Sequence, residues 1–263
     1  MRAVEATERF AAVMSGPEAE LALDEAALLI AAHARPELDV GRQRARLDEL
    51  ASGVTTPNLD GLCHYLFGSQ RFAGNVTDYY DPQNSYLDRV LDRHLGIPIT
   101  LAVLLIEVGR RIGVVLHGVN MPGHFLVGDA AAPDVLVDAF AGGTRLDRRG
   151  AEALFRDRQG AASPFLPDFL RPVSPHRIIA RMLANLDVIA TARADRFMLA
   201  WVVRLRAAVP HAGPAMQRRL AAALAECGRL DEAAEVLERL ARAGHPGSAG
   251  DRTAALRLRA RLS

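Results

Sequence analysis

The sequence predicts an α+β fold: a core with a small antiparallel sheet, followed by an all-α C-terminal region. Two observations support this prediction. Three β-rich runs, VVLHGV, HFLVGD and VLVDAF, follow one another near the middle of the chain and are separated by Gly, Pro, Asn and Asp. From about residue 177 onwards, by contrast, apolar residues recur at helical spacing to the end of the chain.

The chain divides into four predicted segments. Residues 1–55 form an N-terminal helical segment, because LDEAALLIAAHA places apolar residues on one helical stripe. Residues 56–160 form the core, which mixes helices with the short strands. A linker rich in Pro and Ser follows at residues 161–176, and residues 177–263 form a region of helical repeats.

Composition and charge exclude several classes of function. The 263 residues carry a formal net charge of +1, so we expect neither nucleic acid nor an anionic membrane as a partner. The start of the chain lacks a signal peptide's apolar stretch, and the longest apolar run is too short to span a bilayer, which predicts a cytoplasmic protein. Cys63 and Cys227 suggest neither a disulfide framework nor a zinc knuckle. No cofactor or metal is expected.

The segment LDRHLGIPITLAVLLIEVGRRIG predicts a turn followed by a helix that begins at Pro98. Proline is favoured in the first turn of a helix because its missing N–H costs nothing there. Thr100 falls in the same turn, close to unpaired backbone N–H groups and the positive end of the helix dipole. An apolar stripe makes this helix a core element, and it comprises Leu101, Leu104, Leu105 and Val108.

HFLVGD and VLVDAF flank AAAPD and therefore predict an antiparallel hairpin. If the hairpin centres on Ala131, residues pair when their numbers add up to 262, so that His124 faces Asp138 with Cβ atoms about 5 Å apart. Asp138 could then accept the Nδ1–H of His124, as the orienting acid of a catalytic triad does, or the two residues could form a purely structural pair that stabilises the cleft. A register shift of one residue would separate them. We expect His124 and Leu126 to share the sheet face that meets the central helix.

The C-terminal region has the pattern of a helical repeat. AMQRRLAAALAECGRLDEAAEVLERLARAG has Gly228 at a turn between two helices and resembles a tetratricopeptide unit, whose period is about 34 residues. An earlier segment can be laid over it with Ala200 matching Ala233. The small or apolar positions of the unit are Leu220, Ala221, Leu224, Ala233 and Leu237. An ordinary helical bundle explains the same pattern, because only two units are visible.

Several motifs resemble those of the SirB-type transglutaminase-like/tetratricopeptide family. They are LDEAALLIA, RFAGNVTDYYDPQNSYLDRVLDRHLGIPITLAVLLIEVGRRIG, GVNMPGHFLV and VDAFAGG, and the resemblance runs from about residue 20 to 240. It implies a transglutaminase/papain-like α+β core followed by a tetratricopeptide-like tail. It leaves the biochemical activity open.

The sequence departs from active transglutaminase-like enzymes at the start of the central helix. Those enzymes carry a catalytic cysteine there, in a pattern like G-x-C-x-x-x-A, whereas this chain reads GIPITLA and has Pro98 in that place. A thiol at a helix N-terminus becomes more nucleophilic because the dipole lowers its pKa, and the Thr100 hydroxyl gains little from this. Cys63 lies outside the matched motif and is expected to pack in the fold.

We therefore expect a non-catalytic or catalytically impaired transglutaminase-like domain that acts as a protein-binding or regulatory module. A protein or peptide partner would bind through the repeat region or the cleft. The alternative is an active hydrolase or acyltransferase that uses His124 and Asp138 with Thr100 or a bound water.

Two further expectations concern polar residues near the cleft. The residues expected to bind there are Asn84, Ser85, Tyr86 and Pro98. Ser85 is also a good N-cap for the helix that follows it, and this cap is its expected role. Metal binding is a third hypothesis with less support, because its candidate ligands show no metal-binding spacing; they are His64, His94, His117 and His124.

Overall fold

The computed structural model describes residues 3–262 and divides into two compact units. Residues 17–182 form the first, called the core unit below. Residues 3–16 together with 183–262 form the second, called the helical unit. The helix α8 (Pro175–Ala192) begins in the core unit and ends in the helical unit. The four segments expected from the sequence stay a prediction.

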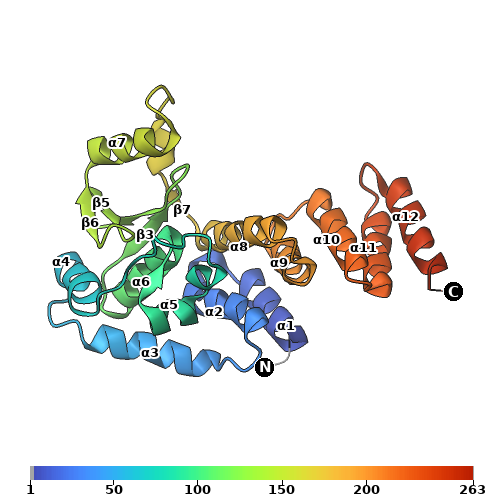
Figure 1. Ribbon diagram of the computed structural model, residues 1–263, viewed down its shortest axis with the longest axis horizontal. Coiled ribbons are helices and arrows are strands. Elements are labelled where there is room, and N and C mark those ends of the chain that lie inside the picture. The colour runs from blue at the N-terminus through green and yellow to red at the C-terminus, as the bar shows by residue number, and fades with distance from the viewer. Residues whose placement is uncertain (1–2, 263) are drawn as a thin grey trace. The chain divides into compact units, whose positions relative to one another are not determined.

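A five-stranded antiparallel sheet belongs to the core unit, with the strand order β6-β5-β4-β3-β7 (Figure 1). Its strands are β3 (Leu116–Val119), β4 (Leu126–Asp129), β5 (Ala132–Asp138), β6 (Thr144–Leu146) and β7 (Pro172–Val173). The strands β3 and β4 fall within VVLHGV and HFLVGD, whereas β5 overlaps VLVDAF but begins three residues earlier, at Ala132, inside the stretch expected to form the hairpin loop. The prediction of a small antiparallel sheet is therefore confirmed.

The core unit also contains a set of helices, which begin and end as follows: α2 (Leu23–Ala34), α3 (Val40–Ser52), α4 (Leu59–Cys63), α5 (Leu87–Arg93), α6 (Pro98–Arg111) and α7 (Arg148–Gln159). A π-helical segment, His64–Ser69, continues α4, and 3₁₀ turns occupy Glu18–Glu20, Pro82–Ser85 and Pro167–Leu170. The central helix α6 begins at Pro98, as predicted. Its residues 98–109 are all buried, so the buried surface is wider than the predicted stripe.

Apolar side chains cover both faces of the sheet. On one face, Leu116 approaches Gly109 of α6. On the other face, Leu126 packs with Phe155 of α7, and Figure 1 shows the two helices on opposite sides of the strands. The expectation that Leu126 faces the central helix is therefore wrong. A sheet covered on both sides carries apolar residues on both, so hydrophobicity alone does not choose the face.

Two short parallel strands tie the start of α6 to an earlier part of the chain. β1 (Ala73–Gly74) pairs with β2 (Leu95–Gly96), and the backbone N–H of Asn75 donates to the carbonyl of Gly96. The loop 75–81, which follows β1, is thereby anchored beside the helix start.

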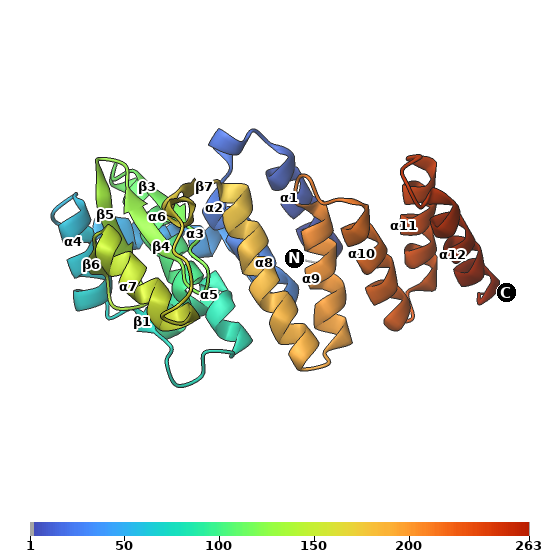
Figure 2. The same cartoon turned by 90° about the horizontal axis from the view of Figure 1, so that it is seen from above.

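The helical unit consists of α1 (Ala3–Ser15), the end of α8, α9 (Arg196–Ala208), α10 (Pro214–Glu226), α11 (Leu230–Arg242) and α12 (Ser248–Ala260). The helices α9 to α12 lie side by side in chain order (Figure 2). Gly228, with a φ of 77°, makes the turn between α10 and α11, as predicted. Ala233 is fully buried in a cluster with Leu224 and Leu237. None of the helices in the described part of the chain is long and apolar enough to cross a membrane.

Candidate functional site

His124 and Asp138 lie together at one end of the sheet, and both are buried. Nε2 of His124 is 2.9 Å from Oδ2 of Asp138. The expected contact was through Nδ1, so the ring meets the carboxylate with its other nitrogen. The ring N–H is not aligned with an acceptor, because Nε2 makes no hydrogen bond within residues 3–262 despite this short distance. The two groups are therefore close to each other without a directed hydrogen bond between them.

The hairpin between β4 and β5 has a different register from the one expected. Val127 pairs with Val137 and Gly128 with Leu136, so the numbers add up to 264. The turn itself is tight and joins Asp129 to Ala132, and the extra residues on β5 form an irregularity next to it. An offset of two residues keeps the same face in register, because side chains alternate with a period of two. His124 and Asp138 consequently remain neighbours, on a diagonal instead of directly opposite.

A turn presents His124 to the site. The N–H of His124 donates to the carbonyl of Met121 at 3.0 Å, with Pro122 and Gly123 between them. Gly123 has a φ of 78°, which together with Pro122 matches the geometry and residue preference of a type II turn. The sequence Pro-Gly directly before His124 therefore fixes where the histidine leaves the turn.

The carboxylate of Asp138 is positioned by hydrogen bonds from the backbone that follows it. Its Oδ1 accepts the N–H groups of Phe140 and Ala141, at 3.0 and 3.2 Å. The Phe140 ring then meets the His124 ring edge to face, with centroids 6.2 Å apart, and contacts Tyr79 from the loop 75–81 in a similar way. Sequence reasoning missed both Tyr79 and Phe140, although both lie in the motifs TDYYDP and VDAFAGG that carry the resemblance.

Thr100 is buried in the first turn of α6, where its hydroxyl has two structural partners. Oγ1 accepts the N–H of Ile97 at 3.1 Å and donates to the carbonyl of Asn84 at 2.6 Å. A hydroxyl that donates its single proton to a carbonyl is not activated for attack. The geometry of Thr100 is that of a residue that joins the helix start to the chain before α5.

Asn84 organises the loop 75–81 through its side chain. Its Oδ1 accepts from Asn75, and its Nδ2 donates to the carbonyls of Asp78 and Tyr79. All of the amide's hydrogen-bonding groups are therefore used inside the fold. Because Asn84 also contacts Thr100 through its backbone, one network of hydrogen bonds runs from the start of α6 to the backbone of Tyr79.

Ser85 does not cap the following helix, so that expectation is wrong. The N-cap of α5 is Tyr86, whose side chain makes no capping hydrogen bond, and Ser85 lies one residue earlier at the end of a 3₁₀ turn. The hydroxyl of Ser85 is buried and has no partner within residues 3–262. The true cap in this stretch is Asp81, whose carboxylate accepts the N–H of Gln83.

The candidate nucleophiles differ in how far they are suited to catalysis. Pro98 occupies the first position of α6 and is buried. Cys63 is the last residue of α4 and is partly buried, and this burial raises the pKa of its thiol to about 11. A thiol with that pKa is protonated near neutral pH and is a poor nucleophile. The structure therefore places no activated nucleophile among the residues that the sequence singled out.

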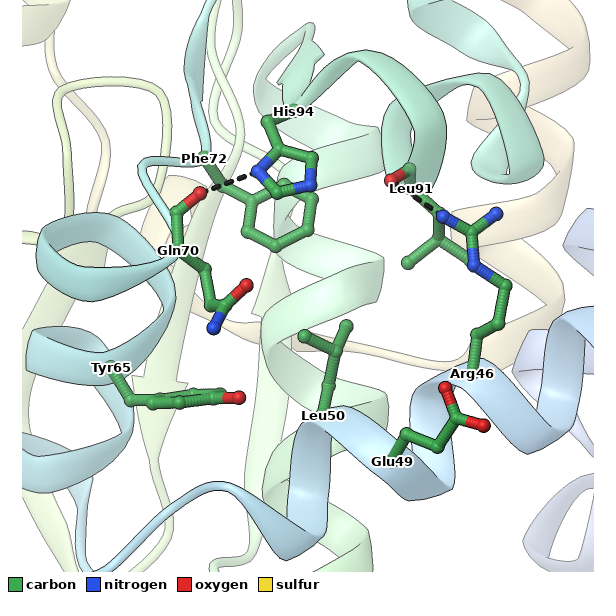
Figure 3. A pocket seen from close by; sticks show the side chains of 8 residues that line it. All are labelled: Arg46, Glu49, Leu50, Tyr65, Gln70, Phe72, Leu91 and His94. Carbon is green, nitrogen blue, oxygen red and sulfur yellow. Dashed lines mark hydrogen bonds between the residues drawn. The ribbon is translucent and has the colours of Figure 1, made fainter.

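The four histidines considered as metal ligands are distributed over different elements. Within residues 3–262, no group of three or more His, Cys, Asp or Glu side chains is arranged to hold a metal ion. His117 lies on β3, and burial lowers its pKa, opposed by the nearby charge of Asp129. His94 is the C-cap of α5, and its Nδ1 is hydrogen-bonded to the carbonyl oxygen of Gln70 (Figure 3).

A family profile described as the transglutaminase-like superfamily matches residues 22–184. The chain is 39% identical over 193 residues to a UPF0162 protein of Xylella fastidiosa, a match that covers 67% of each protein. It is 35% identical over 185 residues to a UPF0162 protein of Pseudomonas aeruginosa, with 66% of this chain and 67% of that protein covered.

A eukaryotic protein is similar over a shorter stretch. F-box only protein 21 of Mus musculus is 34% identical over 137 residues, which are 49% of this chain and 21% of that protein. No solved structure matches.

Proposed function

Because the chain belongs to the transglutaminase-like superfamily, we propose that it keeps the frame of a transglutaminase-like site without a working nucleophile and acts as a protein-binding or regulatory module. The observation that carries this proposal is the hydroxyl of Thr100, which is committed to Ile97 and Asn84. The proposal includes membership of the SirB-type branch with tetratricopeptide-like repeats and a cytoplasmic location.

Exposed apolar side chains beside the site support a binding role. Val76 and Tyr80 are 79% and 67% exposed, and both lie in the loop that Asn84 organises. Tyr79, which contacts Phe140, is 38% exposed. Large apolar side chains held on an ordered loop are typical of protein contact surfaces.

The relatives are compatible with a module that works inside different proteins. The segment shared with F-box only protein 21 makes up 21% of that protein, so the same type of domain is there combined with a much longer chain. Such reuse of one type of domain in chains of different length is compatible with a binding module.

The helical unit offers a second contact surface in this proposal. A hollow of about 540 Å³ lies between its last helices and is lined by small and apolar side chains, among them Ala221, Leu237 and Leu258. The side chains of Arg257 and Arg261 also line it. A peptide with apolar and acidic residues fits such a surface.

The alternative is a hydrolase or acyltransferase in which His124 and Asp138 act with Thr100 or a bound water. The 2.9 Å approach of the imidazole to the carboxylate is the observation on the side of this alternative, but an oriented base also needs an aligned hydrogen bond, which Nε2 of His124 does not make within residues 3–262. Labelling with a fluorophosphonate probe separates the two. We expect no stoichiometric labelling of Thr100. If His124→Ala keeps the fold but eliminates a measurable peptidase or acyl-transfer activity of the purified protein, the binding-module proposal is wrong.

The binding role has its own test. We expect that a partner captured from native cells by the wild-type protein is lost from the Tyr80→Ser variant. The matched control is Phe197→Ser, which removes a 64% exposed aromatic side chain from the helical unit. Loss of the partner from the control alone would show that the partner binds the helical unit. Retention by both variants would contradict the proposal that the loop 75–81 binds it.

A further inference from the structure

Two arginine side chains flank the turn that presents His124. On one side, Nη1 of Arg181 in α8 donates to Oδ1 of Asn120 at 3.2 Å, directly before the turn. On the other side, a Cβ added to Gly123 would lie 3.5 Å from Cβ of Arg158, near the end of α7. Both arginines belong to the core unit, and they approach the same short stretch of backbone from different helices.

The hydroxyl of Tyr79 lies within the electrostatic reach of both arginines. Burial raises the pKa of this hydroxyl, and the positive charges of Arg181 and Arg158 oppose the rise. No carboxylate is among the groups that shift this pKa. The hydroxyl has no hydrogen-bond partner within residues 3–262, so its proton is available to a ligand. Two cationic groups and one hydroxyl donor therefore lie close together beside the turn.

Neither arginine has an ion-pair partner in the described part of the chain. Asp157 precedes Arg158, but the two side chains point about 100° apart around α7, and Arg158 lies on the side of Phe155, which packs against the sheet. The exposed Asp78 likewise makes no ion pair among the described residues. The carboxylate of Asp138 accepts two backbone N–H groups and lies against the imidazole. The nearby carboxylates therefore leave both guanidinium groups available to a ligand.

Apolar side chains continue this surface along the loop 75–81. The rings of Tyr79 and Tyr80 meet edge to face, with centroids 5.3 Å apart. Tyr80 and Val76 are largely exposed. The surface thus combines a cationic end with apolar area, and a complementary partner carries a negative charge next to apolar side chains.

We propose that this surface binds an acidic segment of a partner protein. One carboxylate side chain of the partner would lie between Arg158, Arg181 and the hydroxyl of Tyr79. Guanidinium groups bind carboxylates through charge-assisted hydrogen bonds, often two in parallel. The apolar neighbours of that carboxylate would cover Tyr80 and Val76. This inference rests on the proposed function, because it names the chemistry of the partner that the loop 75–81 contacts.

The test is a nuclear magnetic resonance titration of the ¹⁵N-labelled full-length chain with the peptide acetyl-Leu-Glu-Leu-amide. Both ends of this peptide are blocked, so its only charge is the glutamate side chain. We expect saturable shifts of the backbone amides of Tyr80 and Gly123 and of the side-chain Nε–H groups of Arg158 and Arg181. Acetyl-Leu-Gln-Leu-amide has the same shape without the charge and should bind about tenfold more weakly. Equal affinity of the two peptides, or shifts that do not saturate, would overturn the proposal.

A third peptide tests whether the carboxylate comes from a side chain or from a chain end. Acetyl-Leu-Gln-Leu with a free C-terminus carries the same single negative charge, but the charge follows the apolar side chains and does not lie between them. We expect it to bind more weakly than the glutamyl peptide. Tighter binding would assign the arginines to the C-terminus of a partner and contradict the proposal.

Substitution of the arginines completes the experiment. Arg158→Gln and Arg181→Gln should each weaken binding of the glutamyl peptide about tenfold and leave binding of the glutaminyl peptide unchanged. Arg181→Gln also removes the contact with Asn120, whereas Arg158 is exposed and makes no such contact, so Arg158→Gln tests the charge alone. The matched control is Arg149→Gln, at an exposed position in the first turn of α7. Unchanged affinity of both variants, or an equal loss in the control, would show that the carboxylate is not held as proposed.

Failure of this inference differs from failure of the proposed function. If the glutamyl peptide does not bind but Tyr80→Ser still loses its captured partner, the acidic segment is wrong and the binding module stands. If His124→Ala keeps the fold and eliminates a measured activity, the proposed function is wrong whether or not the peptide binds.

Discussion

The core unit and the helical unit bury polar side chains in different ways. Eleven polar or charged side chains are buried within residues 3–262, and nine of them belong to the core unit. The two in the helical unit are Asp187 and Asp251, and each is bound by arginine side chains. The core unit also buries carboxylates beside arginine, namely Asp24, Asp88 and Glu107. It differs in that it also buries neutral groups that are satisfied by hydrogen bonds, such as Asn75, Asn84 and Thr100.

This difference indicates which unit depends on particular polar side chains at particular positions. A buried carboxylate with an arginine partner can often be replaced by an apolar pair without loss of the fold. A neutral network requires each donor and acceptor in its place, because an unsatisfied buried group costs free energy. The network from Asn75 through Asn84 to Thr100 therefore holds the loop beside His124 in one geometry, whereas the helical unit serves as a packed scaffold.

The largest expected effect breaks the neutral network at Thr100. Thr100→Val keeps the shape but leaves the N–H of Ile97 and the carbonyl of Asn84 buried without a partner, which should cost about 2–4 kcal/mol of unfolding free energy. Chemical denaturation measures the loss. Thr100→Ser keeps the hydroxyl and is the matched control, with a cost of about 1 kcal/mol for the missing methyl group. Equal costs for both variants would show that the hydrogen bonds contribute little.

The next effect tests the packing of the helical unit. Ala233 is fully buried between helices, so Ala233→Leu should destabilise the protein by about 1–3 kcal/mol through overpacking. Ala222→Leu places the same side chain at an exposed position of α10 and should change stability by less than about 0.5 kcal/mol. Separate melting of the helical unit in Ala233→Leu would sharpen the distinction between the two units. One cooperative transition would weaken it.

The sequence predicted the fold more reliably than the site. The helix start at Pro98, the three β-rich runs and the turn at Gly228 follow from local signals that act over a few residues. The register of the hairpin did not follow, because the tight turn at Asp129 and the irregularity beside it depend on backbone pairing that composition does not reveal.

In the candidate site, too, local sequence signals predicted some features and missed others. His124 and Asp138 were brought together correctly, since a register offset of two preserves the sheet face. The prediction that Ser85 caps the following helix was wrong, because a 3₁₀ turn ends at that residue and the helix begins only at Leu87. The ring of Phe140 beside His124 was not foreseen, because contacts between distant segments have no signal in local spacing.

A smaller effect is expected at the carboxylate of the candidate pair. Asp138→Asn retains an oxygen that accepts the N–H groups of Phe140 and Ala141, so it removes only the charge next to His124 and should cost about 1 kcal/mol. Asp138→Ala loses the backbone contacts as well and should cost about 2–3 kcal/mol. Thermal unfolding of the two variants measures the difference. Equal costs would mean that Asp138 acts through the imidazole alone.

A pH-dependent effect is expected for the buried carboxylate of Asp24. Burial raises its pKa, but the hydrogen bond from Arg111 and the charges of Arg44 and Arg111 outweigh burial, so the pKa is lowered from 3.8 in the folded state. A carboxylate with a lowered folded pKa stabilises the protein above its unfolded pKa, and this contribution is lost as the pH falls below about 3.8. Asp24→Asn should therefore be less stable than the wild type at pH 6, and the difference should shrink between pH 4 and pH 2.5. The exposed Asp134→Asn variant is the control and should follow the wild-type curve. A difference for Asp24→Asn that stays constant over this range would show that Asp24 contributes through packing and not through its charge.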